Sequence, residues 1–362
     1  MKNVTPDISV VMAVYNGEKF LKETLDSILS QTFENFEVVV IDDCSTDGTA
    51  DILKGYSERD GRIKVFKNET NKKLARSLNR GIELAQGKYI VRMDADDICL
   101  KNRLERQFSF MESHPKTDLS FCKFFSFCDG EIIPGCVGRK TDENSIKAMF
   151  LFFCPVLHPG VIVKSSVIKK YRYDPSHTCS EDLDLWIRIM CDGVSISSSG
   201  DFLMLYRIHG DSITANSLER QKNEVLISEK FFYEKMLAGL PKELEHFYIN
   251  GVYFKTDFNK NKLCAFYKYI ASENGKKRSF SKQGIVDSFA EILAEYKRQG
   301  KLGAKEIPFI LRFGGLKMVR ALLGKKARAK NDIKSARQAA AENGFVLNRE
   351  ENGLPIYCLE KK

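Results

Sequence analysis

The sequence lacks any long hydrophobic run. Its longest apolar stretch, residues 148–157, is about half of the roughly 20 residues that a membrane-spanning helix needs. No amino-terminal targeting signal precedes the first strand-like stretch, and the ten cysteines form no C-x-x-C pair and no metal-ligand spacing. We therefore expect a cytoplasmic protein whose thiols are reduced.

The sequence also lacks a glycine-rich phosphate loop. The first strand-like stretch, residues 8–14, is followed by Tyr15-Asn16-Gly17-Glu18, which fits neither G-x-G-x-x-G nor G-x-x-x-x-G-K-[ST]. This disfavours a nicotinamide-dependent dehydrogenase and a P-loop enzyme. If a diphosphate binds to this protein, a metal ion has to neutralise it.

The composition is that of a soluble globular protein. The chain has 362 residues, 43% of them hydrophobic and 29% charged, so it can build a sizeable core and more than one domain. The formal net charge is +9, but nine Lys or Arg side chains and a single acidic one, Glu306, lie within residues 301–330. The excess charge is therefore local, which indicates one anionic surface partner.

Strand-like and helix-like stretches alternate from residue 8 to about residue 126. The pattern predicts strands at 8–14, 37–41, 63–66 and 89–93, and helices at 18–30, 49–56 and 74–85. A further helix is expected at 181–191, with short strands near 194–198 and 203–208. The alternation predicts an α/β fold in which helices cover both faces of a mostly parallel sheet.

The character of the sequence changes after Thr214, where long Lys- and Glu-rich helical stretches begin. We therefore predict two parts, residues 1–214 and a mainly helical region 215–362. Within the second part, residues 301–330 combine the basic charge with a partly amphipathic helix. The final stretch predicts a hairpin that turns at Asn352-Gly353.

An acidic cluster, Asp94-Ala95-Asp96-Asp97, directly follows the predicted strand 89–93. Carboxylates this close repel one another unless a cation or water lies among them, and Mg²⁺ and Mn²⁺ prefer such oxygen ligands. Polar groups at 15–17 and 42–48 follow two other strands, and ligands of open parallel sheets bind at this edge. Helix capping and turn formation would explain some of these side chains without a ligand.

A series of ordered motifs makes the chain resemble the family-two inverting glycosyltransferases of the GT-A fold. The motifs are SVVMAVYN (9–16), VIDDCSTDGT (40–49), NRGIELAQGKYI (79–90), DADD (94–97), SEDLDLWIR (180–188) and YRIH (206–209). The resemblance covers roughly residues 6–214. It implies a nucleotide-sugar donor and a divalent metal, Mn²⁺ or Mg²⁺.

The resemblance also implies which side chains bind the donor. Ala13 and Tyr15 would line the nucleoside pocket, and Asp43 would accept a hydrogen bond from the uracil imide. The chain departs from the family at Lys73, where relatives usually have glycine. Lys73 or Arg76 would then face a phosphate, and Arg76 is our candidate.

The acidic cluster would hold the metal. By the same resemblance, Asp94 would contact the ribose or the metal, and Asp96 would coordinate the metal that bridges the diphosphate. His209 would be a further ligand of the metal or the diphosphate. A single histidine without this context is more often a structural hydrogen-bonding group.

The candidate catalytic base is Asp182, because the resemblance gives this position that role. An aspartate with a reference pKa of about 3.9 is ionised at neutral pH and can accept a proton from an acceptor hydroxyl. The alternative is structural, since Glu181 and Asp182 at a helix start would complement the helix dipole by about 0.3–1 kcal/mol.

The sequence thus predicts a metal-dependent inverting glycosyltransferase that uses a nucleotide sugar, most simply a UDP-sugar, and a glycan or lipid-linked glycan acceptor. The segment 301–330 would either rest on an anionic membrane at the inner face of the cell or form an ordinary solvated helix face. Nucleic acid is not an expected partner, because no aromatic residues alternate with the basic ones. Two alternatives remain, a sugar-nucleotide pyrophosphorylase and a catalytically silent carbohydrate- or membrane-binding module.

Overall fold

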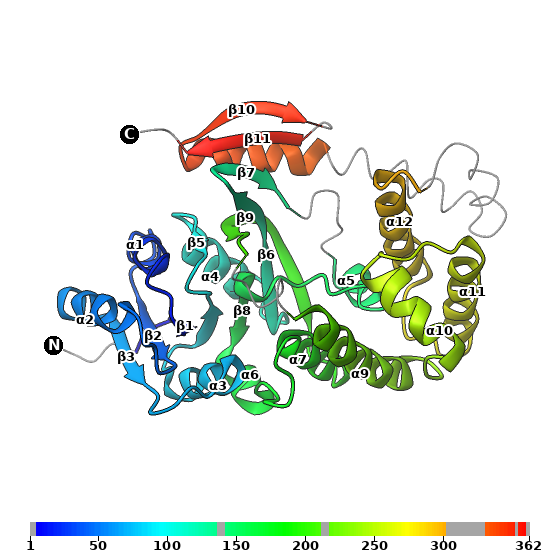
Figure 1. Cartoon of the computed structure of the whole chain (residues 1–362), viewed down its shortest axis with the longest axis horizontal. Coiled ribbons are helices and arrows are strands. Elements are labelled where there is room, and N and C mark those ends of the chain that lie inside the picture. The colour runs from blue at the N-terminus through cyan, green and yellow to red at the C-terminus, as the bar shows by residue number, and fades with distance from the viewer. Residues whose placement is uncertain (1–4, 136–141, 211–216, 302–329, 352–353, 360–362) are drawn as a thin grey trace.

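The computed structural model describes residues 5–135, 142–210, 217–301, 330–351 and 354–359. One twisted sheet runs through the molecule from β3 to the carboxyl-terminal hairpin, which extends one of its ends, and a bundle of helices lies beside α5 and α7, on the side away from β3 (Figure 1). The strands are β1 (Ile8–Val14), β2 (Phe36–Asp42), β3 (Ile63–Lys67), β4 (Tyr89–Arg92), β5 (Ile98–Cys99), β6 (Leu119–Cys128), β7 (Glu131–Pro134), β8 (Val161–Lys164), β9 (Ile196–Arg207), β10 (Phe345–Glu351) and β11 (Leu354–Leu359).

The helices of the first part are α1 (Leu21–Leu29), α2 (Thr49–Arg59), α3 (Leu74–Leu84), α4 (Arg103–Ser113), α5 (Glu143–Met149), α6 (Ser165–Tyr171) and α7 (Glu181–Cys191). Those of the second part are α9 (Leu218–Met236), α10 (Lys242–Phe247), the π-helical η2 (Tyr248–Tyr253), α11 (Lys260–Lys277) and α12 (Lys282–Arg298). A 3₁₀ turn, η1, spans His158–Gly160, and residues 330–342 are also helical.

The sheet changes character across its width. Its strand order is β10-β11-β7-β6-β8-β4-β1-β2-β3, and β4, β1, β2 and β3 are parallel to one another. From β8 outward most pairs are antiparallel, although β9 runs parallel to β6. The parallel half places the carboxyl ends of β1, β2 and β4 at one edge, which is where the polar clusters follow.

Helices cover both faces of the parallel half. Because strand side chains alternate between faces, Val10 and Met12 of β1 pack with α1, α2 and α4, whereas Val11 packs with α3 on the other face. Helix α3 approaches the sheet so closely that a Cβ on Gly81 would lie 2.7 Å from a Val11 methyl. The expected α/β fold with helices on both faces is confirmed.

The helical second part shares a core with the sheet. One continuous apolar cluster extends from Val11 and Val39 through α7 to residues of α9, η2, α11 and α12, including Phe232, Phe266 and Phe289. The division at residues 214 and 215 falls within 211–216, outside the described residues, and stays a prediction. Within the described part of the chain, no helix combines the length and the apolar character that crossing a membrane requires.

The carboxyl-terminal strands lie on the first part of the chain. β10 and β11 pair antiparallel, and β11 joins β7 at the edge of the sheet. An ion pair between the buried Lys123 of β6 and Asp332 fastens the preceding helix to the same place. The turn residues Asn352 and Gly353 and all but the ends of the basic segment 301–330 lie outside the described residues.

Candidate active site

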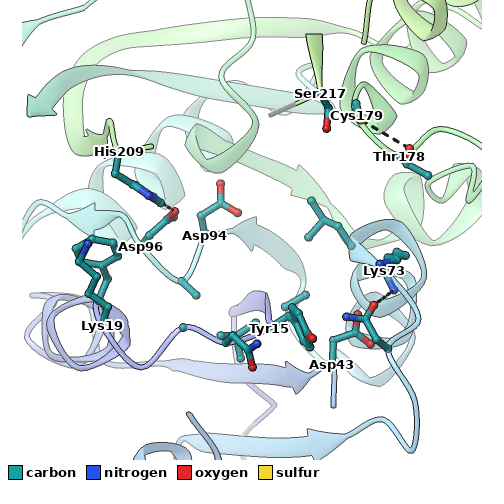
Figure 2. A pocket seen from close by; sticks show the side chains of 18 of the residues that line it. Tyr15, Lys19, Asp43, Lys73, Asp94, Asp96, Thr178, Cys179, His209 and Ser217 are labelled. Atoms are coloured by element: carbon teal, nitrogen blue, oxygen red, sulfur yellow. Dashed lines mark hydrogen bonds and ion pairs between the residues drawn. The ribbon is translucent and has the colours of Figure 1, made fainter. Parts of the chain in front are cut away.

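A cavity of about 540 Å³ opens where β1, β2 and β4 end. This volume is in the range of pockets that hold small-molecule ligands and cofactors. Six stretches of chain form its walls, with Ser217 and Arg220 added from the second part: Ala13–Gly17 with Lys19 and Phe20, Asp43, Asn71 with Lys73 and Leu74, Asp94–Asp96, Thr178–Cys179 and His209 (Figure 2).

One side of the cavity carries the predicted nucleoside-binding side chains (Figure 2). Ala13 lies in the penultimate position of β1 and Tyr15 directly follows the strand, with 51% of Tyr15 exposed. Asp43 is buried, and its Oδ1 accepts hydrogen bonds from Asn68 Nδ2 and the Lys72 backbone N–H, each at 2.7 Å. These two hydrogen bonds fix the orientation of the carboxylate, and both use Oδ1, so Oδ2 can accept a hydrogen bond from another donor.

The opposite side carries the acidic cluster (Figure 2). Asp94, Asp96 and Asp97 each offer an oxygen atom, and these atoms lie within 4.8 Å of one another. His209 Nε2 lies 2.9 Å from Asp96 Oδ2, so the histidine and the cluster meet although 113 residues separate them. The predicted metal ligands Asp96 and His209 are therefore neighbours in the fold.

The donor atoms of this cluster fit a divalent cation. Two buried polar atoms, His209 Nδ1 and Asp97 Oδ2, have no hydrogen-bond partner within the described part of the chain. The other Asp97 oxygen accepts the Arg207 backbone N–H at 2.8 Å, which fixes the orientation of that carboxylate. Carboxylate oxygens with an imidazole nitrogen are ligands that suit Mn²⁺ and, for the oxygens, Mg²⁺.

The electrostatics of the cluster also favour a cation. Burial raises the pKa of Asp97 well above its usual value, and the neighbouring Asp94 and Asp96 carboxylates raise it further. Burial likewise raises the pKa of Asp94, although an ion pair with the buried guanidinium of Arg92 opposes this shift. The positive charge of Arg92 offsets only part of the repulsion among the three carboxylates. A divalent ion bound to these oxygens would relieve the rest.

Asp182, the predicted base, is not among the residues that line the cavity. It occupies the first turn of α7, three residues after the wall residue Cys179. Burial raises its pKa, hydrogen bonds from the Leu183 and Asp182 backbone N–H groups and the charge of Arg92 lower it, and Asp94 raises it. Arg92 thus lies within electrostatic reach of both Asp94 and Asp182.

Glu181 differs from its neighbour in protonation. Burial, and then repulsion by Asp182, raise the pKa of Glu181 to about 8, so it is largely neutral at pH 7. His158 Nδ1 lies 3.8 Å from Glu181 Oε1, but burial and then Arg92 lower the pKa of His158 well below its usual value. At neutral pH the His158 imidazole is therefore uncharged and Glu181 is largely protonated.

The two candidate cations for a phosphate, Lys73 and Arg76, differ in whether they line the main cavity. Lys73 lines the main cavity, whereas Arg76 lines a small adjoining hollow with Pro175 and His177. Lys73 is the N-cap residue of α3 and has φ 69° and ψ 165°, a conformation that favours glycine. The role of Arg76 stays a prediction, and of these two side chains only Lys73 lines the main cavity.

Several wall residues were not predicted from the sequence. Arg220 and Ser217 come from the start of α9, and Thr178 and Cys179 come from the loop before α7. Arg207, which does not line the cavity, supports the acidic cluster from behind, since its Nε donates to the Asp96 carbonyl at 2.7 Å. Its place within the YRIH motif was a signal for this role, whereas nothing in the sequence placed Arg220.

The chain belongs to glycosyltransferase family 2. The model of that family, Glycosyl transferase family 2, matches residues 9–134. An uncharacterized glycosyltransferase of Methanocaldococcus jannaschii is 38% identical over 252 residues, which cover 69% of this chain and 84% of the relative. The Escherichia coli UDP-Glc:alpha-D-GlcNAc-diphosphoundecaprenol beta-1,3-glucosyltransferase WfaP is 30% identical over 219 residues, 60% of this chain and 84% of its own.

Solved structures share the fold. TarS 1-349 of S. aureus in complex with UDP-GlcNAc superposes with a TM-score of 0.54 at 20% identity, covering 98% of each chain. The mannosyltransferase PcManGT of Pyrobaculum calidifontis, in complex with GDP-Man and Mn²⁺, gives 0.52 at 14% identity over 93% of this chain and 88% of that one. The expected GT-A fold and the assignment to the family-two glycosyltransferases are thus confirmed.

Proposed function

We propose that the protein is a metal-dependent inverting glycosyltransferase that moves a sugar from a UDP-sugar to an acceptor hydroxyl. The observation that carries the proposal is a single cavity with an aromatic ring and an aspartate on one side and an acidic cluster with a histidine on the other. A nucleoside diphosphate has complementary chemistry at its two ends, a stackable base and an anionic phosphate pair.

The nucleoside side favours uracil as the base. The Tyr15 ring offers a face for stacking. Asp43 is held by two hydrogen bonds on Oδ1, so Oδ2 can accept the imide N–H of uracil. Cytosine has an acceptor at that ring position and would meet the carboxylate unfavourably. Two similar proteins agree with this choice. The TarS structure contains UDP-GlcNAc, and the name of WfaP contains UDP-Glc.

Asp96, His209 and Asp94 or Asp97 would hold Mn²⁺ or Mg²⁺. When bound, the ion supplies positive charge to the diphosphate as it leaves. Lys73, Lys19 and Arg220, which all line the cavity, would add to this charge. Arg92 has a different task, because its buried guanidinium pairs with Asp94 and lowers the pKa of that carboxylate against the effect of burial, which favours its ionised form.

Asp182 would accept the proton of the acceptor hydroxyl. As it loses this proton, the acceptor oxygen forms a bond to the anomeric carbon from the side opposite the diphosphate. The bond between that carbon and the diphosphate breaks, so the configuration at the carbon is inverted. Neutral Glu181 beside it avoids a second negative charge at the attacking oxygen. A positioned base of this kind contributes about 10²–10⁴-fold to the rate.

The acceptor would be a growing surface glycan, lipid-linked as in the name of WfaP. A lipid-linked acceptor requires the enzyme to work at a membrane surface, most simply at its inner face. The basic segment 301–330 would meet anionic lipid there. Because residues 302–329 lie outside the described part of the chain, this contact rests on the sequence alone.

A panel of nucleotide sugars tests the proposed function. Thermal shifts are measured with UDP, GDP and CDP and with their common sugar conjugates, each with Mn²⁺ and with EDTA. We expect the largest shift with UDP and Mn²⁺, and Mn²⁺-dependent release of UDP from one UDP-sugar. Equal shifts with CDP, or release that persists in EDTA, would contradict the proposal.

A further inference from the structure

Helix α9 presents a row of three polar side chains to the loop that precedes α7. Arg220, Glu224 and Ser228 are spaced four residues apart and therefore share one helix face. Arg220 Nη1 lies 3.4 Å from Thr178 Oγ1, and Ser228 Oγ lies 3.3 Å from His177 Nε2. We call these three residues the α9 stripe. It contacts loop residues 177–180 along their length.

Glu224 makes the densest set of these contacts. Its Oε2 accepts hydrogen bonds from three successive backbone N–H groups, those of Thr178, Cys179 and Ser180, at 3.0, 2.8 and 3.1 Å. Oε1 accepts the Thr178 hydroxyl at 3.0 Å. The carboxylate is largely buried, and hydrogen bonds of this charged type are stronger than neutral ones.

The contact with Ser180 matters for the next helix. Ser180 is the N-cap residue of α7, and its side chain makes no capping hydrogen bond to the helix. Its hydroxyl lies 3.3 Å from Glu224 Oε2 and donates to it. A capping hydroxyl would otherwise compete for the Asp182 and Leu183 backbone N–H groups, which interact instead with the Asp182 carboxylate.

We infer that the α9 stripe, through Glu224, is a positioning element that sets the orientation of Asp182 and the cavity wall formed by Thr178 and Cys179. The inference rests on the proposed function, since it takes Asp182 as the base. It makes the helical second part of the chain a component of the active site. Glu224 does not line the cavity, so it would act through the loop.

Three variants test the inference. Glu224→Ala removes the carboxylate, and Glu224→Gln keeps its length and one carbonyl oxygen for the loop N–H groups. Glu234→Ala, at an exposed position of the same helix, is the matched control. For each full-length variant we measure amide hydrogen exchange at residues 178–180, the Kd of UDP with Mn²⁺, and kcat for UDP release from the UDP-sugar that the panel identifies.

We expect faster exchange at residues 178–180 in Glu224→Ala and a fall in kcat of about 100-fold, as for an Å-scale misplacement of a reacting group. The UDP Kd should change much less than kcat, Glu224→Gln should recover part of the rate, and Glu234→Ala should match the wild type. Unchanged exchange in Glu224→Ala would overturn the inference, and so would equal losses in kcat and UDP affinity. If the wild type shows no turnover, the proposed function fails, while the exchange result still decides whether Glu224 holds the loop.

Discussion

Lys73→Gly should make the protein more stable while weakening its hold on an anionic donor. Lys73 has φ 69° and ψ 165°, a region of backbone space that is essentially restricted to glycine. Its side chain is exposed on the cavity wall, so glycine would lose little packing. A non-glycine residue in this region costs about 1–3 kcal/mol.

The net stabilisation by Lys73→Gly is smaller than the strain that it removes, because glycine has more conformational freedom than lysine in the unfolded chain. This entropy amounts to about 0.5–1 kcal/mol, so we expect a net stabilisation of about 0.5–2 kcal/mol. In a chain of this size that corresponds to a Tm increase of a few degrees at most. Loss of the ammonium group should weaken UDP binding about two- to fivefold, the range of an exposed ion pair.

Calorimetric Tm and UDP titrations with Mn²⁺ measure both effects. Lys72→Gly is the matched control, because Lys72 is also exposed but does not have a positive φ. That control should lower the Tm slightly and leave the UDP Kd close to the wild-type value. A Lys73→Gly protein that melts at or below the wild-type temperature would refute the strain argument. An unchanged UDP Kd would remove Lys73 from the donor site.

Two further predictions concern pH and packing. Because burial raises the folded-state pKa of Glu181 to about 8, its contribution to stability is fully present below the unfolded pKa of about 4.5 and is lost as the pH rises through 8. Glu181→Gln should therefore flatten the decline of Tm between about pH 4.5 and 8, and an unaltered profile would argue against a protonated Glu181. Gly81→Ala should destabilise by about 1–3 kcal/mol, because its Cβ would lie 2.7 Å from a Val11 methyl. Gly55→Ala on α2, with nothing within 4 Å of its Cβ, should instead stabilise by about 0.5–1 kcal/mol in urea titrations; a loss of stability there would contradict the packing argument.

The parallel half of the fold was predictable from local pattern. The expected bounds of β1 and α7 agree with the structure, since a buried apolar run and an acidic helix start are unambiguous there. Beyond β4 the pattern was weaker. The residues before and after Ser199-Gly200 suggested two short strands, but β9 runs without a break from Ile196 to Arg207. β9 pairs with β6 on both sides of this polar stretch, up to Ser198 and again from Phe202, and the register shifts near Lys123 accommodate the unpaired residues between them.

Only those residues of the candidate site that belong to the family motifs could be predicted from the sequence. Asp43, Asp96 and His209 meet at one cavity as the ordered motifs imply. The contribution of α9 was not visible, because Arg220 and Glu224 form a pattern only when their helix lies against the loop before α7. The same holds for the effect of Arg92 on the pKa of Asp182, which depends on packing between segments that are distant in the sequence.

The most direct test of the account is the Asp182→Asn variant, assayed for both UDP-sugar binding and sugar transfer. Asparagine keeps the shape of the side chain but cannot take up a proton, so we predict UDP affinity near the wild-type value and transfer reduced by about 10²–10⁴-fold. Transfer close to the wild-type rate would contradict the assignment of Asp182 as the base, and with it the mechanism proposed for this cavity.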